Sequence, residues 1–162
     1  MTSEYSSVAV LLAAHNGMMW LEEQIESILS QKSILVKIFI SVDFSNDKTY
    51  DWCQNLAKKN TRVNVLPYGN TFGGAAKNFF HLIQNVDFLG FDYISLADQD
   101  DIWNDEKLHY AIETIKMEDL DGYSSNVIAF WSNGRKKLVK KSFPQKKFDY
   151  YFEAAGPGCT YV

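Results

Sequence analysis

The chain has 162 residues, of which 46% are hydrophobic and 22% charged, and its formal net charge is −4. This length suffices for one globular domain with its own core, so we expect a single domain over residues 1–162. The negative charge argues against a nucleic acid as partner. There is no apolar run of about 20 residues and no export-signal pattern, which favours a cytoplasmic protein.

Predicted strands and helices alternate four times along the first part of the chain. Runs of apolar and β-branched residues predict the strands, and apolar side chains repeated on one helical face predict the helices. The predicted strands cover residues 7–14, 35–42, 62–66 and 92–97, and the helices that follow them end near residues 30, 59, 86 and 116. This order predicts an α/β fold with a mostly parallel, Rossmann-like sheet flanked by helices.

Further along, the pattern changes. Residues 126–132 and 136–143 read as a pair of strands, so we expect an antiparallel element near the C-terminus.

Four polar loops follow the predicted strands. They read "HNG", "DFSND", "GNTFGGAAKN" and "DQDDIWND", at residues 15–17, 43–47, 69–78 and 98–105. Open parallel α/β sheets bind ligands at the carboxyl ends of their strands, so the four loops together predict one ligand site.

The last loop places three aspartates in four positions after an apolar strand. On an extended chain Asp98 and Asp100 face the same side, and Gln99 turns away. Two carboxylates that converge near solvent suit Mg²⁺ or Mn²⁺, and such an ion relieves their repulsion. Asp101 and Asp105 have another interpretation, as residues that cap or begin the next helix.

The other loops offer contacts for a nucleotide. Asp43, at the end of the second strand, can accept a hydrogen bond from a nucleobase or a ribose hydroxyl. Lys77 and Asn78 begin a helix after flexible glycines, where they can meet a phosphate. His15 can stack on a base or bond to it, although a structural role is an alternative. The chain has neither a Walker-type loop nor a GxGxxG fingerprint.

Residues 135–147 hold seven of the sixteen basic residues and no acidic one. The stretch is either a solvated lysine-rich hairpin or a patch that faces anionic lipid headgroups or a phosphorylated lipid carrier. The second interpretation predicts peripheral contact with the inner face of a membrane.

Five segments, in this order, resemble glycosyltransferase family 2, the inverting nucleotide-sugar-dependent enzymes of the GT-A fold. They are "VAVLLAAHNG", "EEQIESILSQ", "SVDFSNDKT", "NTFGGAAKNF" and "ADQDDIW". The last is typical of the bacterial rhamnosyltransferase-like branch, and the resemblance covers nearly the whole chain.

The resemblance implies how a nucleotide would bind. Asp43 would bind the base, uracil or thymine, while Ala13 and His15 would line the nucleotide pocket. Two positions depart from the family pattern: Val42 stands where a first aspartate is usual, and Phe44 where glycine is usual. The choice between a UDP-linked and a dTDP-linked donor stays open.

The resemblance also implies a metal site. Residues 98–100 would be the DXD motif, with Asp100 holding a divalent ion on the donor's pyrophosphate and Asp98 supporting the ribose or the metal. Three further residues would lie on the acceptor side: Asp101, Trp103 and Gly158. The general base would lie beyond Val162, so no catalytic residue is assigned, and we expect the chain to be an N-terminal portion that is incomplete at its C-terminus.

These roles imply an enzyme that transfers a sugar, with rhamnose as a candidate, from a nucleotide-diphosphate sugar to a growing cell-surface polysaccharide or lipid-linked glycan. Transfer would be metal-assisted and inverting. The alternative is a non-catalytic or truncated nucleotide-sugar-binding module.

Overall fold

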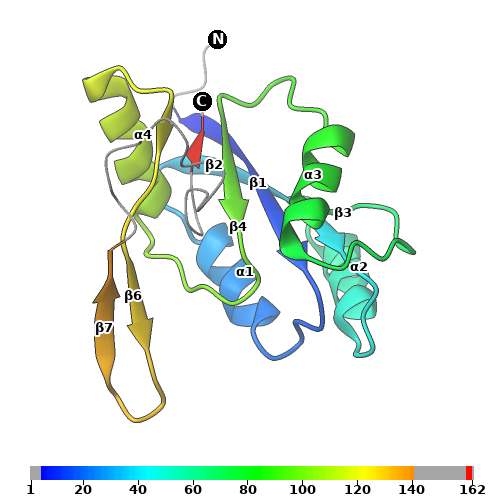
Figure 1. Ribbon diagram of the computed structural model, residues 1–162. Helices are drawn as coiled ribbons and strands as arrows, with labels where there is room; N and C mark the ends of the chain where they lie inside the picture. The colour runs from blue at the N-terminus through cyan, green and yellow to red at the C-terminus, as the bar shows by residue number, and fades with distance from the viewer. Residues whose placement is uncertain (1–4, 141–159, 162) are drawn as a thin grey trace.

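The computed structural model describes residues 5–140 and 160–161, and it is built around one mixed sheet (Figure 1). The strand order is β3-β2-β1-β4-β8-β5. The strands are β1 (Ser6–Ala14), β2 (Ile34–Val42), β3 (Val63–Val65), β4 (Tyr93–Ala97), β5 (Gly122–Tyr123) and β8 (Thr160–Tyr161). The first four pair in parallel, and β8 pairs antiparallel with both β4 and β5. The predicted α/β fold with a mostly parallel sheet is confirmed.

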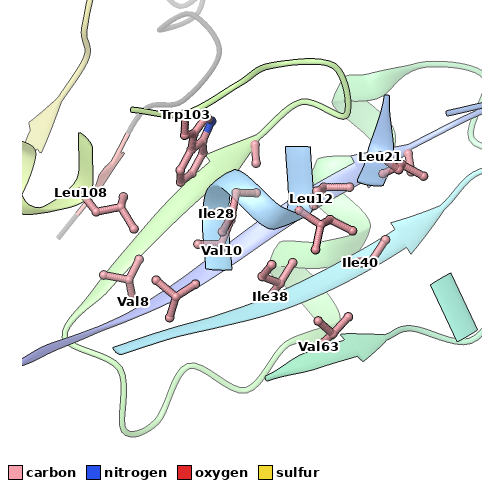
Figure 2. Packing of buried hydrophobic residues seen from close by; sticks show 14 of the residues in the cluster. Val8, Val10, Leu12, Leu21, Ile28, Ile38, Ile40, Val63, Trp103 and Leu108 are labelled. Carbon is pink, nitrogen blue, oxygen red and sulfur yellow. The ribbon is translucent and has the colours of Figure 1, made fainter. Parts of the chain in front are cut away.

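Helices cover both faces of the sheet. They are α1 (Leu21–Leu29), α2 (Thr49–Lys59), α3 (Ala75–Asn85) and α4 (Lys107–Glu118). Alternate residues of β1 point to opposite faces, so Val10 packs in the same cluster as buried residues of α1, α2 and α4 (Figure 2), while Leu11 packs with α3. Because both faces are covered, β1 is apolar and buried from Val8 onward, as the sequence predicts.

A second, two-stranded sheet extends away from the first (Figure 1). It is an antiparallel hairpin of β6 (Val127–Phe130) and β7 (Lys136–Val139). The antiparallel element predicted from the sequence is therefore present, although its last expected residues, 141–143, lie outside the described part of the chain.

One expected detail of α4 is wrong. This helix begins without any side-chain hydrogen bond at its N-cap, Glu106, so neither Asp101 nor Asp105 caps it. The carboxylate of Asp105 forms an ion pair with Lys32, which follows α1, and this contact joins the start of α4 to the end of α1.

Within residues 5–140, no helix combines the length and the apolar character needed to span a bilayer.

Candidate functional site

A pocket with a volume of about 480 Å³ lies at the carboxyl ends of β1, β2 and β4. The start of α3 and the glycine-rich loop before it form another part of its wall. Six of the residues selected from the sequence line it: Ala13, His15, Asp43, Asn78, Asp98 and Asp100. The predicted convergence of the loops on one ligand site is thus seen in the geometry, because parallel strands present their carboxyl ends along one edge.

Asp43 is buried immediately after β2, and its carboxylate collects backbone donors. The N–H groups of Phe44 and Phe72 donate to Oδ1 at 2.8 Å, and that of Gly73 donates to Oδ2 at 3.0 Å. Burial alone would raise the pKa of Asp43, but these donors and the nearby His15 outweigh it and hold the pKa below its usual value. The carboxylate therefore fixes the glycine-rich loop against the end of β2.

The turn after β1 is tied to the loop after β2. Asn16 adopts a left-handed conformation with φ of 46°, its N–H donates to Ser45 Oγ at 3.1 Å, and its Oδ1 accepts from the N–H of Asn46 at 2.8 Å. The N–H of Gly17 donates to Thr49 Oγ1 at 2.8 Å. Asparagine suits this position because its short polar side chain tolerates positive φ. These bonds hold His15, whose side chain is exposed, at the pocket mouth.

The aspartate loop differs from its prediction in one respect. Since β4 ends at Ala97 and Gln99 lies in a turn, the alternation of an extended strand does not continue through residues 98–100. Gln99 therefore lines the same pocket as Asp98 and Asp100, and its predicted outward orientation is wrong. Its side-chain amide instead forms two hydrogen bonds with the backbone of His15.

Polar side chains in and just after α1 form hydrogen bonds with the aspartate loop, residues 98–105. Gln24 and Ser27, three residues apart on one face of α1, and Gln31, two residues beyond the end of this helix, are hydrogen-bonded to the backbone of Asp98, Trp103, Asn104 and Leu108. The shortest contact, from Gln31 Nε2 to Asn104 O, is 2.7 Å. Reasoning from the sequence missed these residues. The available signal was a row of uncharged polar residues beside the apolar face of the helix.

Asn78 does not fit the phosphate contact predicted for it. The side chain is buried, and its Nδ2 donates to the carbonyl oxygens of Ser41 and Ala14, at 3.0 and 3.4 Å. A phosphate needs a donor, and the donors of this amide already join the ends of β1 and β2. Lys77 is exposed and does not line the pocket.

Two of the residues expected on the acceptor side, Asp101 and Trp103, also lie apart from the pocket lining. The ring of Trp103 is 5% exposed, packs in the core (Figure 2) and has Lys107 Nζ 3.7 Å from its centre, so it belongs to the core and not to an acceptor surface. Asp101 is half-buried; burial raises its pKa, Lys107 opposes the rise, and Asp100 adds to it. Gly158 lies outside the described residues.

For a metal ion, the pocket offers Asp98 and Asp100. Within the described part of the chain, no three His, Cys, Asp or Glu side chains gather as a ready metal site. Two carboxylates at an open pocket nevertheless match the way Mg²⁺ binds, through one or two protein carboxylates together with substrate phosphates and water. The donor set fits an ion that arrives with a diphosphate.

A mostly parallel sheet with a polar pocket at the carboxyl ends of its strands is a ligand-binding architecture of α/β proteins. Two solved structures share this fold, which is the GT-A fold. Staphylococcus aureus TarS residues 1–349 match with a TM-score of 0.69 and 18% identity over 96% of this chain and 46% of that one. The mannosyltransferase PcManGT from Pyrobaculum calidifontis, in complex with GDP-Man and Mn²⁺, matches with a TM-score of 0.63 and 13% identity. The match covers 95% of this chain and 44% of PcManGT.

The family model for glycosyl transferase family 2 matches residues 9–157, and the chain belongs to this family. The resemblance noted in the sequence is confirmed. The dTDP-rhamnosyl transferase RfbG of Shigella flexneri is 49% identical over 152 residues, which cover 93% of this chain and 53% of RfbG. The chain therefore spans about half the length of this curated relative.

Proposed function

We propose that this chain provides the donor site of a glycosyltransferase that uses a deoxythymidine diphosphate sugar, with rhamnose as the sugar transferred. The observation that carries the proposal is one pocket lined by Asp43 at one strand end and by Asp98 and Asp100 at another. The identity of 49% with a dTDP-rhamnosyl transferase supports the choice of donor.

The base site is assigned to Asp43. A carboxylate offers about four lone-pair positions, and three of those on Asp43 take the backbone N–H groups of Phe44, Phe72 and Gly73. One acceptor position remains on Oδ2, which suits the N3–H of thymine or uracil and not the N3 acceptor of cytosine.

Phe44 supports thymine over uracil. Its ring is 52% exposed, although apolar, and it lines the pocket directly beside Asp43. An aromatic ring in this place offers apolar contact to the C5-methyl group that only thymine carries. Structures of TarS hold UDP and UDP-GlcNAc, so the uracil nucleotide is the natural comparison.

We assign Asp98 and Asp100 to hold Mg²⁺ or Mn²⁺ with the donor's diphosphate. Such an ion neutralises the charge that develops on the leaving nucleotide diphosphate. The two side chains would orient the diphosphate for attack by an acceptor hydroxyl from the opposite side of the sugar, which inverts the anomeric centre. The general base that takes the acceptor proton stays a prediction.

The acceptor side of the proposal is a growing cell-surface polysaccharide or lipid-linked glycan, reached through peripheral membrane contact. The β6–β7 hairpin supports this. Ile128 and Leu138 pair across it, and with Phe130 they share one face on which each is about 60% exposed. Residues 124–140 contain four basic residues and no acidic one. Apolar side chains beside lysine and arginine suit an anionic lipid surface.

Calorimetric titration of the chain with dTDP and with UDP, each with and without Mn²⁺, tests the donor assignment. We expect Mn²⁺-dependent binding of both, several-fold tighter for dTDP, and loss of that preference in Phe44→Gly. If neither nucleotide binds, the proposal fails. Release of dTDP from dTDP-rhamnose, measured in the presence of acceptor with a longer protein that contains this chain, then separates a transferring enzyme from the alternative, a module that binds the donor without turnover.

A further inference from the structure

We propose that Gln99 is a positioning residue that sets the separation between the base-binding and the diphosphate-binding sides of the pocket. The inference rests on the proposed function, since it concerns how the same pocket holds a nucleotide diphosphate. It goes beyond that function in assigning a role to the residue between the two aspartates.

The side chain of Gln99 joins two loops through a pair of hydrogen bonds to the backbone of His15, which we call the clasp. Its Oε1 accepts from the backbone N–H of His15 at 2.8 Å, and its Nε2 donates to the backbone oxygen of His15 at 3.0 Å. One side-chain amide thus satisfies both backbone groups of one residue, as a neighbouring strand would. The two loops that it joins follow β1 and β4 and are 84 residues apart in the sequence.

Gly17 provides the space for this clasp. A Cβ atom at this position would lie 2.5 Å from Oε1 of Gln99, closer than Cβ atoms approach other atoms, and 3.1 Å from both Cδ of Gln99 and Cδ1 of Leu21, which is a tight contact. The φ angle of Gly17 is not positive, so its backbone conformation does not demand glycine. The main reason for glycine at this position is the close approach of Gln99 Oε1, and Leu21 Cδ1 adds a second, looser contact.

The clasp is one link in a chain of hydrogen bonds across the pocket. From His15 the next residue, Asn16, donates its N–H to Ser45 Oγ, and this hydroxyl donates to the backbone oxygen of Asp43 at 2.8 Å. On the far side, Gln24 of α1 donates to the backbone oxygen of Asp98 at 3.0 Å. The proposed base ligand and the proposed metal ligands are therefore held at a fixed separation through Gln99.

A fixed separation matters only to a ligand that occupies both sides at once. Linking two contacts through a rigid connection raises their combined affinity, because the second contact forms at a high effective concentration. A nucleoside that occupies the base side alone, or a metal pyrophosphate that occupies the other side alone, gains nothing from the link. This difference separates a positioning role from a general contribution to stability.

The test uses Gln99→Met, which keeps the length of the side chain and removes both hydrogen bonds. We expect dTDP with Mn²⁺ to bind about tenfold more weakly, while thymidine alone and pyrophosphate with Mn²⁺ keep their affinities within about twofold. The matched control is Gln54→Met, since the Gln54 amide donates to the hydroxyl of Tyr50 within α2 and lies outside the pocket lining. Titrations followed by calorimetry, and by nuclear magnetic resonance for the weaker ligands, give the affinities.

Equal binding of dTDP by the wild type and Gln99→Met would overturn the inference, and so would an equal loss for all three ligands. Failure of the wild type to bind any nucleotide would instead count against the proposed function.

A second pair of variants tests the same contact without relying on the folding of Gln99→Met. Gly17→Ala should weaken dTDP binding about tenfold, because its Cβ must displace the Gln99 amide. In the background of Gln99→Ala the clashing oxygen is gone, so adding Gly17→Ala should weaken binding less than about twofold further. Strictly additive losses would overturn the inference.

Discussion

The rim of the pocket, formed by the loops at residues 15–17, 43–47 and 98–100, differs from the β6–β7 hairpin in the contacts that stabilise it. The rim is joined by side chains that reach backbone groups far away in the sequence, such as Gln99 with His15, 84 residues apart, and Gln24 with Asp98, 74 apart. The hairpin pairs strand with adjacent strand and exposes large apolar side chains. An isolated two-stranded sheet is marginally stable in water. The rim is thus organised before any ligand arrives, while the hairpin gains from contact with a partner.

The largest expected effect comes from breaking the rim at Asp43. In Asp43→Ala the N–H groups of Phe44, Phe72 and Gly73 lose a charged acceptor, so we expect the free energy of unfolding to fall by about 3 kcal/mol. Urea denaturation measures this loss. The same replacement of the exposed Asp121 is the control and should change stability by less than about 0.5 kcal/mol.

The stability that the Asp43 carboxylate contributes should decrease as the pH falls. Its pKa in the folded protein is below the usual value, so its contribution is present above about pH 4 and is lost as the pH falls through the folded-state pKa. The difference in stability between the wild type and Asp43→Ala should therefore shrink toward low pH. A difference that grows as the pH falls would contradict the hydrogen bonds assigned to this carboxylate.

Asp100→Ala should break the function of the rim while sparing its structure. The bonds from α1 to this loop go to backbone groups of other residues, so the fold should keep its stability within about 0.5 kcal/mol. Loss of a metal ligand should weaken Mn²⁺-dependent dTDP binding on the order of a hundredfold, or about 2.7 kcal/mol. Calorimetry with and without Mn²⁺ measures it. Unchanged metal dependence would remove Asp100 from the proposed metal site.

Gln31→Met removes two hydrogen bonds that join the aspartate loop and the start of α4 to the segment after α1. Gln31 Nε2 donates to Asn104 O, and its Oε1 accepts from the N–H of Leu108 at 2.9 Å in the first turn of α4. Methionine fills the same space and leaves these buried backbone groups without that partner, so we expect a loss of about 2 kcal/mol in stability. Thermal and urea denaturation check this. An unchanged stability would mean that α4 and the aspartate loop do not depend on the hydrogen bonds of Gln31.

The comparison also marks what the sequence can reveal. The strands, the helices and the edge of the sheet that carries the site follow from apolar periodicity and from the rule for parallel sheets, and they were predicted. Asp43, Asp98 and Asp100 were found because carboxylates after buried strands have few structural explanations. These residues do line one pocket.

What could not be predicted depends on where a side chain points once regular structure ends. Strand alternation places Gln99 outward, but the turn after β4 brings it into the pocket. Trp103 lies in an irregular loop, where no periodicity reports its burial. The amide of Asn78 bonds to carbonyls of two distant strands, a tertiary contact that a single sequence does not encode locally.

The smallest expected effect lies in the hairpin, and it tests the other half of the comparison. Lys136 pairs with Phe130 across the two strands and therefore lies on the same face as the exposed apolar side chains. Lys136→Gln should change stability by less than about 0.5 kcal/mol, because the side chain is exposed. A lysine near an anionic surface contributes about 1 kcal/mol, so binding to vesicles rich in phosphatidylglycerol should weaken about fivefold.

Sedimentation of the chain with such vesicles, and with neutral phosphatidylcholine vesicles for comparison, measures this binding. Lys58→Gln, at an exposed site near the end of α2, is the matched control and should bind like the wild type. If both lysine variants bind equally, or if charge in the vesicle makes no difference, the hairpin does not face a lipid surface. The lipid assignment would then fail, and a protein partner would be the remaining explanation for the exposed apolar face. The difference between the hairpin and the hydrogen-bonded rim of the pocket would remain.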